Sequence, residues 1–87
     1  MNFFWVILFS LLLLGCVSKA PIQEMSDARL AVTVAQDLLK EKPSKKLMKA
    51  RENLEQATIA IEEQDFNRAR YLAKKAKIQA QTAVKEK

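Results

Sequence analysis

The stretch DFNRARYLAKKAKIQAQTA, residues 65–83, decides the fold class of this 87-residue chain. Its apolar residues recur at spacings of three and four, the period that places side chains on one face of an α-helix. That face comprises Phe66, Ala69, Ala73, Ala76, Ala80 and Ala83, with Leu72 beside it. Because Asp65 is a good N-cap residue, the sequence predicts a helix over residues 66–85.

A second apolar stripe lies just before this stretch, and it predicts a helix over residues 44–63. Ser44 follows Pro43 and can cap its start. The stripe consists of Leu47, Ala50, Leu54, Ala57 and Ile61. Between Ile61 and Phe66 the apolar spacing jumps to five residues, which rotates the apolar face by more than one continuous helix allows. We therefore expect a break near Gln64–Asp65.

A third stripe predicts a helix over residues 26–41, with Ser26 as its N-cap. It consists of Ala28, Ala31, Ala35 and Leu38, with Val32 and Leu39 adjacent. Pro43 disfavours the helical conformation at Lys42 and so separates this helix from the next. Alternating apolar and polar residues, the signal of a strand, are missing from the sequence after residue 25.

Three consecutive amphipathic helices predict an all-α domain over residues 25–87, built as a three-helix antiparallel hairpin stack or bundle. The large side chains expected in its core are Val32, Leu38, Leu39, Leu47, Leu54, Ile61, Phe66 and Leu72. Alanine lets helix axes approach closely but buries little area. An isolated domain of this kind should be marginally stable, so we expect a partner or self-association.

The stripes Met25-x2-Ala28, Leu47-x2-Ala50-x3-Leu54-x2-Ala57 and Asp65-Phe66-x2-Ala69-x3-Ala73-x2-Ala76 resemble an alanine-rich helical domain of unknown function. That domain occurs in small bacterial lipoproteins and ahead of OmpA-type peptidoglycan-binding modules. The resemblance covers residues 21–83. It departs at both turns, where Lys42-Pro43 and Gln64 stand at positions that are often Gly in the family. The resemblance implies a helical fold and brings no catalytic residues with it.

The N-terminal segment is apolar and uncharged. Residues 1–18 contain no Asp, Glu, Lys or Arg, and from Phe3 to Val17 only Ser10 and Gly15 interrupt the apolar run. As a helix this run would be about 22 Å long, whereas the hydrocarbon core of a bilayer is about 30 Å thick. A run of this length is typical of a secretory signal.

The apolar run ends in Leu13-Leu14-Gly15-Cys16, which resembles the lipobox of bacterial lipoproteins. The resemblance implies cleavage after Gly15 and attachment of lipid to Cys16. Residues 1–15 would then be the signal peptide, and residues 16–24 the acylated cysteine and a short tether. Val17 stands where Asp would signal retention in the inner membrane, so the resemblance implies the outer membrane, facing the periplasm. The segment before Cys16 lacks the Lys or Arg that usually begins a lipoprotein signal peptide. The alternative interpretation is an N-terminal anchor that is not cleaved.

Composition excludes several classes of site. With no His, one Gly and one Cys, the chain has no intramolecular disulfide, His–Cys zinc site, glycine-rich phosphate loop or His-based triad. Glu62 and Glu63 point about 100° apart on a helix and do not converge. Three short helices offer little room for a pocket. We therefore expect no catalytic residues, metal or cofactor, and no enzymatic activity.

The net charge of +5 lies in the third predicted helix and its cap, because residues 66–87 contain seven bases and Glu86 as their only acid. One face of that helix combines these bases with two apolar groups. It comprises Tyr71, Lys74, Lys75, Ile78 and Lys85, which we call the basic strip. It suits an anionic polymer, lipid headgroups or an acidic partner helix, and an ordinary solvated face is the alternative. A secreted, acylated protein would not meet nucleic acid.

These patterns predict a lipid-anchored protein of the bacterial envelope with a structural or interaction role. Its partners would be the membrane, through Cys16, and peptidoglycan or another envelope protein. Two other interpretations stay open: an accessory subunit that folds fully only with its partner, and an uncleaved small protein anchored in the inner membrane. The residues do not specify a molecular activity.

Overall fold

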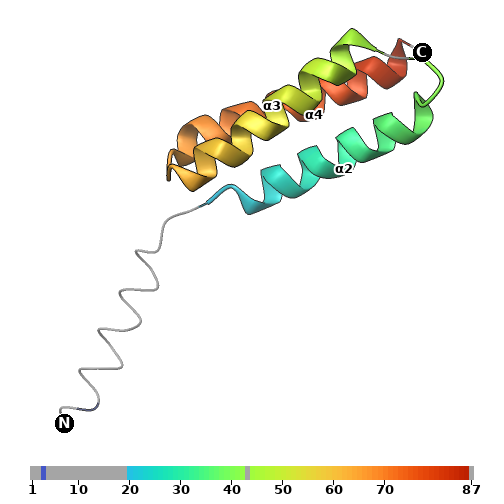
Figure 1. Cartoon of the computed structure of the whole chain (residues 1–87). Helices are drawn as coiled ribbons and strands as arrows, with labels where there is room; N and C mark the ends of the chain where they lie inside the picture. Colours follow the sequence, from blue (N-terminus) through green and yellow to red (C-terminus); the bar gives the residue numbers. More distant parts are fainter. Residues whose placement is uncertain (1–2, 4–19, 43, 87) are drawn as a thin grey trace.

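The structure, a computed structural model, describes residues 3, 20–42 and 44–86. Residues 20–42 and 44–86 form three helices, α2 (Ile22–Leu38), α3 (Lys45–Glu62) and α4 (Phe66–Lys85), and the described residues form no strand. The three helices run up, down and up (Figure 1), so the start of α2 and the α3–α4 turn share one end of the bundle. The predicted all-α three-helix bundle is confirmed.

Helix α4 is the central packing element of the bundle. It packs along both of the other helices, most extensively along α3, whereas α2 and α3 touch each other least. All of its alanines are buried, together with Leu72. Because alanine has no side chain beyond Cβ, a face lined with it lets two neighbouring helices lie close to the same backbone.

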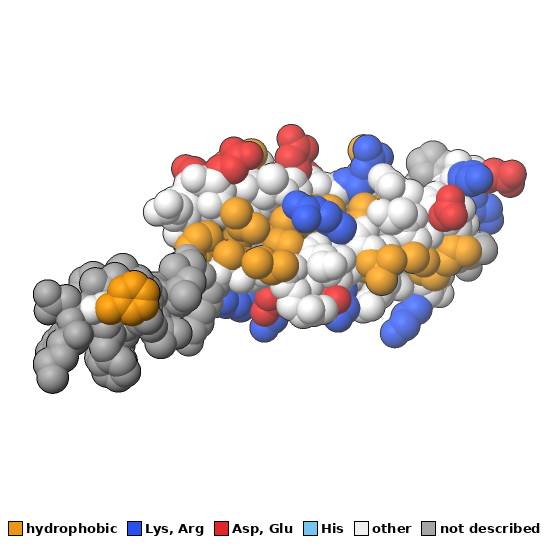
Figure 2. Space-filling model, turned by 90° about the horizontal axis from the view of Figure 1, so that it is seen from below, with side chains coloured by type: hydrophobic (Ala, Val, Ile, Leu, Met, Phe, Trp, Pro, Cys, Tyr) orange, Lys and Arg blue, Asp and Glu red, His pale blue; other side chains and the backbone are white. Residues whose placement is uncertain are grey.

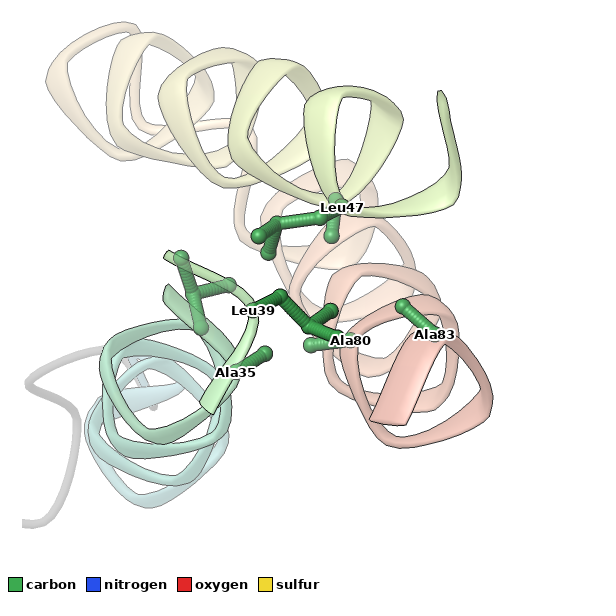
Figure 3. Packing of buried hydrophobic residues seen from close by; sticks show 7 residues of the cluster. Ala35, Leu39, Leu47, Ala80 and Ala83 are labelled. Atoms are coloured by element: carbon green, nitrogen blue, oxygen red, sulfur yellow. The ribbon is translucent and has the colours of Figure 1, made fainter. Parts of the chain in front are cut away.

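The core consists of two clusters along the bundle. One contains Val32, Ala35, Leu39, Leu47, Ala50, Ala80 and Ala83. Figure 3 shows Leu39, which directly follows α2, next to Ala80 of α4, and Leu47 of α3 pointing into the space between the helices. The other contains Met25, Ala28, Ala57, Leu72, Ala73 and Ala76. Leu54 is partly buried and packs against both clusters, so it joins them.

The α3–α4 turn confirms the predicted break. Gln64 has a φ of 61°, in the left-handed region. Two backbone hydrogen bonds close the end of α3. Asp65 N–H donates to the Ala60 carbonyl at 2.8 Å, and Gln64 N–H donates to the Ile61 carbonyl at 2.9 Å. This pair of bonds is the Schellman motif that closes a helix. The Asp65 carboxylate then accepts from Arg68 N–H at 3.3 Å and caps α4. Ser44 caps α3 by accepting from Leu47 N–H at 3.2 Å.

Replacing Gln64 with Gly is expected to stabilise the bundle, because glycine occupies the left-handed region without a steric cost from Cβ. We expect a gain of about 0.5–1 kcal/mol in the free energy of unfolding. The measurement is urea unfolding followed by circular dichroism, with Gln56→Gly as the control. Gln56 lies exposed inside α3, where glycine should destabilise by about the same amount. Loss of stability in Gln64→Gly would contradict the turn geometry.

The first helix differs from its predicted bounds of 26–41. Helix α2 begins at Ile22, with Pro21 rather than Ser26 at the N-cap, and Met25 N–H donates to the Pro21 carbonyl at 3.0 Å. Proline lacks an N–H group, which costs nothing at a helix start, where that group has no partner. Residues 22–24, predicted as tether, are therefore helical. The helix ends at Leu38, and residues 39–41 form a turn.

The predicted core needs one correction and one addition. Leu38 is 48% exposed, because the buried stripe of α2 passes through its neighbour Leu39 and adjacent residues of a helix point about 100° apart. Met25 is only 2% exposed and was missed. Of the remaining predicted residues, Val32, Leu47 and Leu72 are buried, whereas Leu54, Ile61 and Phe66 are partly buried.

Candidate interaction surface

The basic strip lies on the outer side of α4. Tyr71 and Ile78 are each 61% exposed, and Lys74, Lys75 and Lys85 are exposed as well. The Lys75 ammonium stands 5.8 Å from the centre of the Tyr71 ring, one helical turn earlier, a distance that allows a cation–π contact. The strip therefore offers hydrophobic side chains and ammonium groups side by side.

A groove of about 700 Å³ runs between α2 and α4, next to this strip. It is lined by Asp27, Leu30, Ala31, Val34, Lys77, Gln81, Val84 and Lys85. Lys85 belongs to both the groove and the strip, whereas Tyr71, Lys74, Lys75 and Ile78 do not line the groove. The two together form one surface, which we call the α2/α4 face.

Helix α2 contributes hydrophobic side chains that the sequence analysis did not include in the site. Leu30 is 65% exposed and Val34 is 45% exposed. Leu38 continues their spacing of four along α2. Figure 2 views the molecule from the α2 side and shows exposed hydrophobic side chains with Lys and Arg among and around them and several Asp and Glu side chains nearby. The four-residue spacing was visible in the sequence, but only the packed structure places these residues beside α4.

Ion pairs connect α2 to α4 along this face. Arg70 Nε lies 3.5 Å from Glu24 Oε1, and Lys77 Nζ lies 4.0 Å from Asp27 Oδ2. Both pairs are partly exposed, so each adds at most about 1 kcal/mol to stability. They neutralise acids on α2, while Lys74 and Lys85 have no acidic partner within 4.0 Å among the described residues. The α2/α4 face therefore keeps an excess of positive charge.

Among the residues that the structure describes, no three His, Cys, Asp or Glu side chains gather closely enough to hold a metal ion. The described carboxylates that have partners form ion pairs or hydrogen bonds at the surface.

The predicted lipid-attachment residue Cys16 and the lipobox residues Leu13, Leu14 and Gly15 lie outside the described residues. Within the described part of the chain, no helix has both the length and the apolar character needed to cross a bilayer.

Comparison with known proteins gives no match: no protein-family model, no curated protein and no solved structure is significantly similar to the chain.

Proposed function

We propose that this chain is a lipoprotein of the bacterial cell envelope, anchored through lipid on Cys16, with a structural or interaction role played by its helical bundle. The observation that carries the proposal is the sequence Leu13-Leu14-Gly15-Cys16 at the end of an uncharged apolar run. A thiol joined to lipid also accounts for a single cysteine with no disulfide partner. More than one acyl chain makes membrane attachment stable.

The bundle begins close to the proposed anchor. Helix α2 starts at Ile22, six residues after Cys16, a length that spans about 20 Å at most. The bundle would therefore stay near the membrane. Val17 after the cysteine favours the outer membrane and its periplasmic side, where peptidoglycan and other envelope proteins are within reach.

The anchor is tested by replacing Cys16 with Ser and following the chain in growing cells. We expect the variant to lose incorporation of labelled palmitate and to accumulate as an unprocessed precursor in the inner membrane. Ser18→Ala, a change just beyond the lipobox, is the control and should be labelled and processed normally. A Cys16→Ser chain that is still cleaved and sorted like the parent would refute lipid anchoring. An unlabelled parent chain that keeps its N-terminus would indicate an uncleaved anchor.

A second candidate is an accessory subunit whose fold is completed by a partner, and the composition of the core favours it. Apart from Pro21, the buried apolar side chains larger than alanine among the residues that the structure describes are Met25, Val32, Leu39, Leu47 and Leu72. A core this small supplies little more free energy than the chain loses in conformational entropy. Cooperative unfolding of residues 17–87 alone would favour the first candidate, and weak helicity would favour the second.

A further inference from the structure

We propose that the α2/α4 face lies against the surface of the membrane and binds anionic lipid headgroups. This inference rests on the proposed function only in that the chain is held at a membrane by its N-terminal segment. The proposed binding surface is built from α2 and α4. It contains the groove between these helices and lysines whose charge is not neutralised by nearby acids.

The face has the composition of an interfacial binding surface. Leu30 and Val34 of α2 and Ile78 of α4 are exposed, and such side chains gain free energy when they enter the boundary between headgroups and acyl chains. Tyr71 adds an amphipathic ring, which that boundary also favours. A polymer of sugars would gain little from these hydrophobic side chains. The composition therefore favours lipid over peptidoglycan as the occupant.

Charge complementarity specifies an anionic surface. Glu24 and Asp27 are paired with Arg70 and Lys77, so the remaining lysines of the strip provide the excess charge. Lysine side chains can lay their methylene stems along apolar surface while the ammonium group reaches a phosphate. Basic residues near an anionic bilayer each add to the affinity, and a second signal of this kind strengthens a single membrane anchor.

The short distance between the membrane anchor and the bundle favours lipid over an acidic protein helix as the partner of this face. The apolar head ends close before α2, and the start of α2 is at most about 20 Å from Cys16. A short tether gives the bilayer a very high effective concentration at the bundle, whereas a soluble helix has to bind at its own concentration. With the chain anchored, the membrane is the partner that is always within reach.

The test uses the full chain carrying Cys16→Ser, reconstituted through its apolar head into vesicles, with one new cysteine that bears an environment-sensitive fluorophore. Gln81→Cys places the fluorophore in the groove of the α2/α4 face, and Gln56→Cys places it on the outer side of α3. Both sites are exposed glutamines. In vesicles that contain phosphatidylglycerol, we expect a blue shift at residue 81 and none at residue 56. The shift should be absent with phosphatidylcholine alone and should reverse in high salt.

Charge reversal provides the second arm. In the Gln81→Cys chain, Lys74→Glu/Lys85→Glu should lower the ratio of membrane-bound to free bundle at least about tenfold, because each basic residue near such a surface is worth about fivefold. Lys45→Glu/Lys49→Glu on α3 changes the net charge equally and should leave the ratio within about twofold. Circular dichroism should show the same helicity in both variants.

Several outcomes would overturn the inference. These are equal signals at residues 56 and 81, equal signals with both lipids, or equal effects of the two charge reversals. A shift that grows with protein concentration would indicate a second copy of the chain on this face, and no shift in any vesicle would leave a protein partner as its occupant. Because the chain carries Cys16→Ser, each of these results is independent of lipid attachment, which palmitate labelling tests separately.

Discussion

A bundle that carries Leu54→Asp is expected to lose its cooperative unfolding transition and most of its helical circular dichroism. Leu54 is partly buried and packs against both core clusters. Shortening its side chain costs about 2 kcal/mol in lost contacts. Placing a carboxylate there adds the free energy of removing a charge from water without a partner. Together these exceed the roughly 3–5 kcal/mol that a domain of this size can draw from its core.

The control for this prediction is Gln56→Asp, which introduces the same residue two positions later. Gln56 is exposed on the same helix, so the new carboxylate stays in water and should change stability by about 0.5 kcal/mol or less. Leu54→Ala should fall between the two variants. Thermal melting of residues 17–87 provides the comparison. An unchanged melting temperature in Leu54→Asp would mean that the two clusters are not joined through this residue.

The helices could be predicted from the sequence because their apolar spacing and their caps are local properties. Helix α4 begins at Phe66 and ends at Lys85 as predicted, and Ser44 and Asp65 act as caps. The start of α2 was misplaced because two residues could begin that helix. Ser26 has the better capping side chain, but Pro21 begins the helix early enough to bury Met25.

Only the α4 part of the candidate surface could be predicted from the sequence. The α2 part depends on which helices pack side by side. The basic strip follows from the periodicity of α4 alone. The groove needs α2 beside α4, and the contribution of Leu30 and Val34 depends on that packing. Both Leu38 and Leu39 were predicted to be buried, and only Leu39 is, because the rotation of α2 about its axis depends on the same packing.

The alanine face of α4 gives the second large prediction: Ala80→Leu is expected to destabilise the bundle by about 1–3 kcal/mol. Ala80 is fully buried in the cluster that also contains Leu39 and Leu47 (Figure 3). Leucine is nearly as good a helix former as alanine, so helix propensity does not explain such a loss. The lost stability comes from pushing α4 away from its neighbouring helices, whose distance from α4 is set by the methyl side chain of Ala80.

Two comparisons separate close packing from other causes. Gln56→Leu places the same side chain on the exposed side of α3 and should leave the urea midpoint nearly unchanged. Leu39→Ala combined with Ala80→Leu keeps the total side-chain volume of the cluster. The double variant should therefore be more stable than the sum of the two single losses predicts, a coupling that a double-mutant cycle measures. Strict additivity would show that Leu39 and Ala80 do not share the same space, because the volume gained at one position could then not compensate for the volume lost at the other.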